Sequence, residues 1–100
     1  MLPYYNMADY EWDEEKNLEN QEKHGVSFER AKKAFLDTNR IILKDRTHST
    51  PTEIRYYCIG LVGRRVCTVR FTHREGKIRI FGAGFWRAER EIYERKTKNR

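Results

Sequence analysis

The sequence predicts an α+β fold, in which a small antiparallel β-sheet has two N-terminal helices packed on it and a further helix near the C-terminus. Two capped segments with helical patterning fill the first third of the chain. Residues 40–82 are then rich in β-branched and aromatic side chains and are interrupted by short turn signals. A chain of 100 residues has room for one domain with one modest core. These observations exclude a large multidomain enzyme.

The first helix is predicted to begin after Asp13 and to run to His24. Asp13 is a good N-cap, and the two acidic residues that follow it suit the positive end of the helix dipole. Gly25 is a typical residue to end the helix. Residues 10–12 are predicted to form a short strand with Trp12 as a core anchor. One face of this polar helix carries Lys16, Asn20, Lys23 and His24, and a solvated face is the simpler interpretation of it.

The second helix is predicted to begin after Ser27, which fits another N-cap. Apolar residues then recur with helical spacing and form a stripe that would face a core. The stripe consists of Phe28, Ala31, Phe35 and Leu36. The helix is expected to end near residues 37–39.

Turn signals divide the following segment into strands. Gly63-Arg64 and Glu75-Gly76 are each suited to a two-residue hairpin loop. The predicted strands are 40–44, 54–62, 65–72 and 77–82, with a polar loop at 45–52 and a final helix from Phe85 to about Lys96. This last helix carries an apolar stripe, and Glu89 is an unexpected carboxylate within it. Glu89 either lies at the edge of the stripe, pairs with an arginine, or has a function.

The two turns also predict the register, with Tyr57 opposite Arg70 and Thr72 opposite Arg79. Because side chains alternate along a strand, the predicted sheet has two distinct faces. The apolar face carries Ile54, Tyr56, Cys58, Cys67, Val69, Phe71, Ile78 and Ile80. The other face is basic and bears aromatic rings: Arg55, Tyr57, Thr68, Arg70, Thr72, Lys77, Arg79 and Phe81.

The charge is unevenly distributed along the chain, whose formal net charge is +6. Residues 1–37 carry five bases and nine acids, whereas residues 38–100 carry sixteen bases and six acids. A basic C-terminal part indicates an anionic partner. Arginine and tyrosine interleaved on a sheet face suit RNA, because guanidinium groups bind phosphates and rings stack on bases. The alternative interpretation is an ordinary solvated face of an antiparallel sheet.

No apolar run is long enough for a membrane span, and no secretory signal is visible at the start of the chain. Residues 1–8 are interpreted as an N-terminal extension, and Met7 is an alternative to Met1 as the start. Cys58 and Cys67 form neither a metal pattern nor a disulfide framework, so they are expected to be small buried hydrophobic residues. The expected location is the reducing cytoplasm. No cofactor-binding or metal-binding pattern occurs.

Several motifs taken together are similar to the BrnT-type toxins, over about residues 9–95. The matching segments are Trp12-Asp-Glu-Glu-Lys16, Asn20, Lys23-His-Gly-Val-Ser-Phe28, Ala31, Phe35, Glu53-Ile-Arg-Tyr56, Gly60, Val69, Arg74 to Ile80, and Ala88-Glu-Arg-Glu-Ile-Tyr93. The resemblance implies a single RelE-like domain at 9–96, with a basic tail at 97–100. It also implies a type II toxin that cleaves RNA without a metal ion and inhibits translation.

The same resemblance implies partners. A cognate antitoxin is expected, which in this family typically carries a ribbon-helix-helix part and would be BrnA-like. The complex would repress its own promoter, so operator DNA would be contacted only through the antitoxin. Many members follow the last strand with Ser-Ala-Arg, whereas here Gly84 stands at the position of that arginine. Either Arg87, one turn later, substitutes for that arginine, or the catalytic activity is weak.

Metal-independent RNA cleavage needs a base for the ribose 2′-OH, cations for the phosphate and an acid for the leaving oxygen. The predicted catalytic residues are His24, Arg55, Arg70, Arg79 and Glu89. The predicted RNA-binding residues are Lys16, Lys23, Tyr57, Lys77 and Arg87. His24 has a simpler alternative role as a cap for the last helix carbonyls. His48 and His73, in predicted polar segments, rank below it.

Two other classes of function stay open at this point. The basic face and Gly84 also fit a nucleic-acid-binding module without catalytic activity, such as a degenerate toxin. The acidic first third fits a protein-interaction subunit that docks a basic partner, and this role is compatible with a toxin–antitoxin pair.

Overall fold

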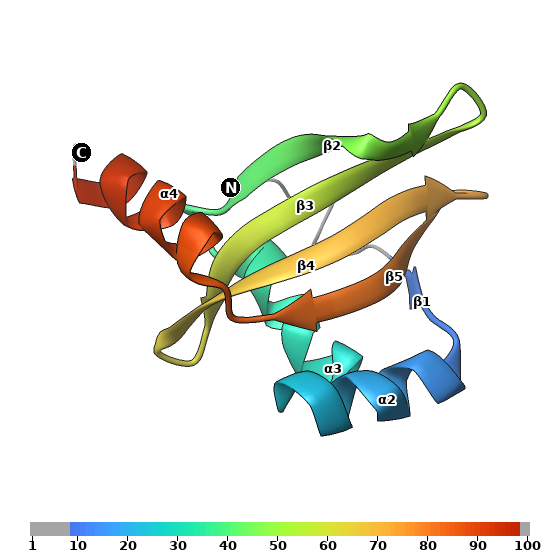
Figure 1. Ribbon diagram of the computed structural model, residues 1–100, viewed down its shortest axis with the longest axis horizontal. Coiled ribbons are helices and arrows are strands. Elements are labelled where there is room, and N and C mark those ends of the chain that lie inside the picture. Colours follow the sequence, from blue (N-terminus) through green and yellow to red (C-terminus); the bar gives the residue numbers. More distant parts are fainter. Residues whose placement is uncertain (1–8, 99–100) are drawn as a thin grey trace.

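The computed structural model describes residues 9–98 and has the predicted α+β architecture (Figure 1). One five-stranded sheet has the order β1-β5-β4-β3-β2. Its elements are β1 (Tyr10–Glu11), α2 (Glu14–His24), α3 (Phe28–Ala31), the 3₁₀ helix η1 (Lys32–Leu36), β2 (Ile41–Thr50), β3 (Glu53–Val62), β4 (Arg65–Arg74), β5 (Lys77–Gly84) and α4 (Arg87–Lys98). The predicted extension at 1–8 lies outside the described residues. So do positions 99–100 of the predicted tail, whose first two residues belong to α4.

The helix α2 begins and ends where its capping residues predict. The Asp13 side chain accepts hydrogen bonds from the backbone N–H groups of Glu15 and Lys16. Gly25 ends the helix in a left-handed conformation with φ 72°, which glycine adopts without steric cost. Just before α2, β1 pairs with β5 in parallel, so the sheet is mixed rather than wholly antiparallel. Trp12 packs edge-to-face on Phe28 and is the predicted anchor.

The second predicted helix is present in two parts. Ser27 caps α3 as predicted, by accepting a hydrogen bond from the backbone N–H of Arg30. After Ala31 the helix tightens into η1, and this change of period alters which side chains face the core. Ala34 is fully buried in place of Leu36, which is 48% exposed. The prediction of a core position for Leu36 was wrong because it assumed 3.6 residues per turn throughout.

The predicted register of the two hairpins is confirmed. Tyr57 pairs with Arg70, and Thr72 pairs with both Arg55 and Arg79 on its two sides. The polar loop predicted at 45–52 is wrong, since β2 continues to Thr50. The Ser49 hydroxyl donates to the Asp45 carbonyl and accepts from the Arg55 N–H, so a side chain completes the hydrogen bonding where the β2–β3 register shifts.

The strand β5 contains a bulge that the sequence did not reveal. Arg70 pairs with Gly82 while the next residue, Phe71, pairs with Ile80. Phe81 is therefore the extra residue on β5. Beyond the bulge the alternation of faces is shifted by one, and Ala83 is turned into the core.

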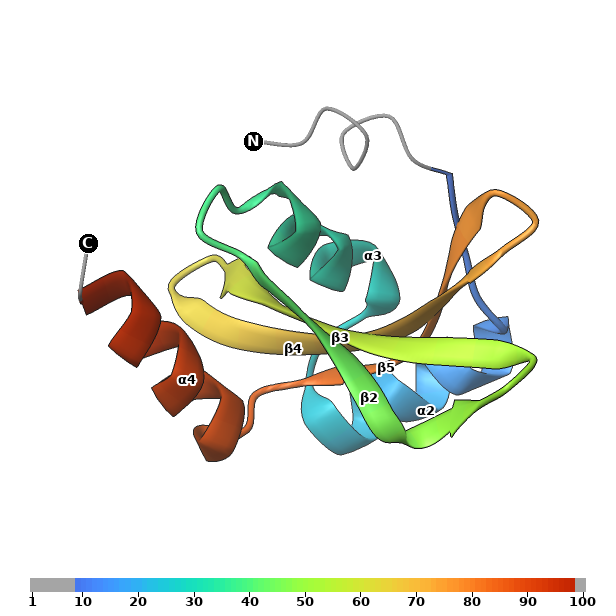
Figure 2. The ribbon, with the colours of Figure 1, turned by 90° about the horizontal axis from the view of Figure 1, so that it is seen from above.

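Helices cover the two faces of the sheet unequally (Figure 2). The segment α3–η1 covers the apolar face, where the predicted residues Cys58, Cys67, Val69, Phe71, Ile78 and Ile80 are all buried. Within residues 9–98, the opposite face is covered at one end, where Tyr93 and Ile92 of α4 pack on Ile41, Ile59 and Val66. The remainder is the open face that carries the predicted cations. Thr68 and Thr72, predicted on it, are buried because they are short side chains in central strands.

Asp37 fastens α4 to the sheet. Its carboxylate accepts hydrogen bonds from the Tyr93 hydroxyl and from the backbone N–H of Leu61 and Asn39. Burial alone would raise the pKa of Asp37, but these hydrogen bonds outweigh it and hold the pKa below its ordinary value.

The two cysteines are buried and form no disulfide, and burial raises the pKa of the Cys67 thiol to about 11. Among residues 9–98, no helix has the length and apolar character to cross a membrane.

Candidate functional site

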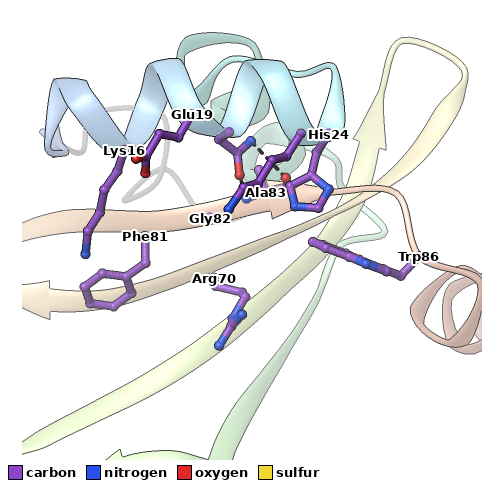
Figure 3. A pocket seen from close by; sticks show the side chains of 10 residues that line it. Lys16, Glu19, His24, Arg70, Phe81, Gly82, Ala83 and Trp86 are labelled. Carbon is purple, nitrogen blue, oxygen red and sulfur yellow. Dashed lines mark hydrogen bonds between the residues drawn. The ribbon is translucent and has the colours of Figure 1, made fainter.

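A pocket of about 260 Å³ lies between α2 and the open face of the sheet (Figure 3). Four predicted site residues line it, namely Lys16, Lys23, His24 and Arg70. The other lining residues are Glu19, Asn20, Phe81, Gly82, Ala83 and Trp86. The basic face of α2 is thus directed toward the basic face of the sheet. It lines a pocket, which the solvated face of an isolated helix would not do.

Two buried asparagines hold this polar helix in place. Asn20 donates from its amide nitrogen to the carbonyls of Val26 and Ala83, and its amide oxygen accepts from the Ala83 N–H. Asn17 accepts from the Phe28 N–H at 2.8 Å. Both asparagines are only 7% exposed. Hydrogen bonds to backbone therefore replace the apolar stripe that usually docks a helix, and they set the position of Lys16, Lys23 and His24 over the sheet.

Arg70 has an electrostatic environment different from those of the other predicted arginines. In the described part of the chain it makes no ion pair with a carboxylate, whereas Arg79 pairs with Glu11 at 3.2 Å. Arg55 pairs with Glu53 at 3.0 Å and lies 4.2 Å from the Phe81 ring centre. Arg70 is therefore the guanidinium on the open face that is most available to an incoming phosphate.

Like Tyr57, two further predicted RNA-binding residues lie outside the pocket. Lys77 begins β5 beside the Glu75-Gly76 turn and is exposed. Arg87 is at the start of α4, where its side chain is 81% exposed and lies 3.7 Å from the carboxylate of Glu91. The structure thus brings neither of them to the pocket lining.

His48 and Asp45 form a pair that sequence reasoning missed. His48 Nδ1 lies 2.8 Å from Asp45 Oδ2, and the Asp45 side chain is 4% exposed. The same nitrogen is 3.4 Å from a terminal nitrogen of Arg70. A protonated Nδ1 that donates to the buried carboxylate fits the shorter contact and leaves Nε2 with a lone pair. The signal in the sequence was the spacing Asp-x-x-His, which was hidden by assigning the segment to a loop.

Tyr57 is influenced by the charges of Arg70, Asp45 and Glu89. Burial, and after it the Asp45 carboxylate, raises the pKa of Tyr57 above its ordinary value. The Tyr57 hydroxyl is protonated at neutral pH, and the Asp45 carboxylate is its hydrogen-bond partner. Glu89 is half-buried in the first turn of α4, and its charge acts on Tyr57. The intermediate burial of Glu89 is compatible with a place at the edge of the apolar stripe of α4.

Trp86 closes one end of the pocket. Its ring lies 5.1 Å from that of His24 in an edge-to-face contact, and the tryptophan is 37% exposed. A Cβ atom on Gly84 would lie only 2.6 Å from the Trp86 ring. The indole thus occupies the space that any side chain at position 84 would need. In the described residues, no cluster of three His, Cys, Asp or Glu side chains is placed to hold a metal ion.

These features define a small α+β protein whose cationic, aromatic-lined pocket suits a single-stranded nucleic acid. The protein family described as the ribonuclease toxin BrnT of type II toxin-antitoxin systems matches residues 12–89. The chain therefore belongs to the BrnT family, and membership implies an antitoxin partner. A search of curated proteins finds no match to this chain.

Proposed function

We propose that this toxin is a metal-independent endoribonuclease that acts at the pocket between α2 and the open face. The observation that supports this most directly is the position of Arg70. It lines the pocket with His24 and lies 3.4 Å from His48 Nδ1, so one guanidinium lies near two groups that can transfer protons. The domain is assigned to residues 9–96.

In the proposed reaction, the ribose 2′-oxygen attacks the adjacent phosphorus atom and the bond to the 5′-oxygen breaks. Nε2 of His48 takes the 2′-OH proton, since Asp45 holds its Nδ1 proton in place. Arg70 stabilises the negative charge that builds up on the phosphoryl oxygens. His24 donates a proton to the leaving 5′-oxygen. The products are a 2′,3′-cyclic phosphate and a 5′-hydroxyl.

The other predicted residues have supporting roles in this proposal. Lys16 and Lys23 bind flanking phosphates from α2, and the Tyr57 ring stacks on a base from the sheet. Arg55 and Arg79 add positive potential despite their ion pairs, and Glu89 orients a cation. Lys77 and Arg87 contact only RNA that extends beyond the pocket. A cognate antitoxin, proposed to be a ribbon-helix-helix protein, would neutralise the toxin in the cytoplasm and carry the complex to operator DNA.

Cleavage of RNA by the purified toxin is expected to continue in excess EDTA and to leave cyclic phosphate ends. The reason is that the proposed nucleophile, base and acid are all supplied by ribose and side chains. Gel electrophoresis with end-group analysis measures both features. Loss of cleavage in EDTA that Mg²⁺ restores contradicts metal independence. RNA binding that weakens with salt, without any cleavage, supports the alternative of a non-catalytic binding module.

Expression of the toxin in cells should also arrest growth by inhibiting translation. Co-expression of the neighbouring antitoxin should relieve this growth arrest.

His48→Gln is expected to slow cleavage by roughly 10²–10⁴-fold, which is the usual contribution of a general base. Glutamine keeps a polar side chain but takes up no proton, so the limb of the pH–rate profile that belongs to the base should disappear. Affinity for a 2′-O-methyl RNA, which cannot be cleaved, should remain unchanged. The matched control is His73→Gln, since His73 packs against Tyr56 and Phe71 away from the pocket. An unchanged pH profile in His48→Gln rejects this role.

A further inference from the structure

A second pocket, of about 200 Å³, lies where the β3–β4 turn meets the start of α4. It is lined by three arginines and by aromatic side chains: Arg64, Arg65, Val66, Phe85, Trp86, Arg90 and Glu94. Figure 1 shows this turn and the first turns of α4 at the same end of the sheet. None of these three arginines has a part in the reaction proposed above.

The three arginines come from two elements, and one carboxylate lines the pocket with them. Arg64 and Arg65 belong to the hairpin, and Arg90 comes from α4. The guanidinium carbon of Arg65 lies 3.7 Å from the Phe85 ring centre, a stacking contact that leaves its N–H edge free to bind an anion. Glu94 is the one carboxylate of the lining, and it lies 4.0 Å from Arg90, at the limit of an ion pair.

Trp86 lines both pockets and so joins them. On one side its ring contacts His24, and on the other side it borders the arginines. A partly exposed indole between two cationic pockets matches the repeat of a single nucleic-acid strand, in which phosphates alternate with flat bases. An acidic protein segment would use the arginines but would not need the ring.

We propose that the second pocket is a nucleotide-binding subsite that holds RNA flanking the cleaved bond, with a base stacked on Trp86 and the next phosphate held by Arg64, Arg65 and Arg90. The proposal rests on the proposed function, because it extends the RNA path out of the first pocket. It assigns the toxin a minimum substrate length greater than the two nucleotides that the chemistry itself requires.

The test compares short and long non-cleavable RNA by fluorescence anisotropy, using a 2′-O-methyl trinucleotide and an oligomer of about ten nucleotides. The double variant Arg64→Gln/Arg90→Gln should bind the long RNA roughly tenfold more weakly, and its slope of log affinity against log salt should fall by about 0.7, since one phosphate contact contributes about 0.7 on single strands. Affinity for the trinucleotide should not change. The control Arg30→Gln/Lys33→Gln removes two exposed cations from the segment that covers the opposite face, and both affinities should remain.

The possible outcomes separate the two proposals. If the unmodified toxin binds neither RNA, the proposed function fails. If it binds both and the double variant behaves as the control does, the subsite is rejected while the proposed function stands. Equal losses on short and long RNA also reject the subsite, because they indicate a general loss of positive potential. If the variant loses affinity for the antitoxin alone, the pocket serves an acidic protein segment and the RNA subsite is rejected.

Discussion

Arg70→Ala is expected to reduce RNA cleavage by about 10²–10³-fold, the loss that follows removal of one preorganised donor to a developing negative charge. The reason is that Arg70 lines the pocket beside His24 and has no carboxylate partner in the described part of the chain. Single-turnover rates on a labelled RNA measure the effect. Arg70→Lys keeps the charge but not the bidentate fork, so it should recover only part of the rate.

The matched control for Arg70 is Arg30→Ala, which removes an exposed arginine from α3 on the other side of the sheet. Its cleavage rate should equal that of the unmodified toxin. Growth arrest on expression should follow the same order as the measured rates. If Arg70→Ala cleaves RNA at the normal rate, the reaction does not take place in this pocket.

Asn20→Ala is expected to lower the free energy of unfolding by about 3 kcal/mol or more, since each buried polar group left without a partner costs about 1–3 kcal/mol. Three backbone groups lose their partner together: the carbonyls of Val26 and Ala83 and the N–H of Ala83. Because these bonds dock α2, the pocket should lose RNA affinity as well. Urea denaturation monitored by circular dichroism gives the free energy.

The control in the same helix is Leu18→Ala. Leu18 is 58% exposed, so its removal should change the free energy of unfolding by less than about 0.5 kcal/mol. A small effect for Asn20→Ala, comparable to that of Leu18→Ala, would mean that α2 is held by other contacts and that water satisfies the backbone groups.

Features of the fold set by neighbouring residues were predictable from the sequence. Asp13 and Ser27 marked helix starts because a capping side chain bonds to N–H groups two or three residues away. The turn Gly63-Arg64 determined the whole β3–β4 register, since one loop fixes every pair behind it. Features that join distant segments were not predictable. The continuation of β2 depends on Ser49, whose hydroxyl bonds to Arg55 across the two strands.

The same distinction applies to the site. The alternation of side chains placed Arg55, Tyr57 and Arg70 on one face, and this is confirmed. The partners of each cation depend on the side chains of other strands and helices, so the sequence did not show that Arg55 would pair with Glu53 while Arg70 would not. The importance of Asn20 was hidden for a similar reason, because its bonds reach Ala83, sixty-three positions along the chain.

The bulge at Phe81 has a consequence for which insertions and deletions the chain tolerates. Strands accept length changes badly because a shift of one residue exchanges the two faces. Adding a residue between Ile80 and Ala83 would turn Ala83 outward, away from Asn20. Deleting Phe81 would keep Ala83 opposite Val69 but would remove the ring that lines the pocket and lies beside Arg55. Length variation in homologous toxins is therefore expected in the β2–β3 and β4–β5 turns, while the number of residues from Ile80 to Trp86 stays constant.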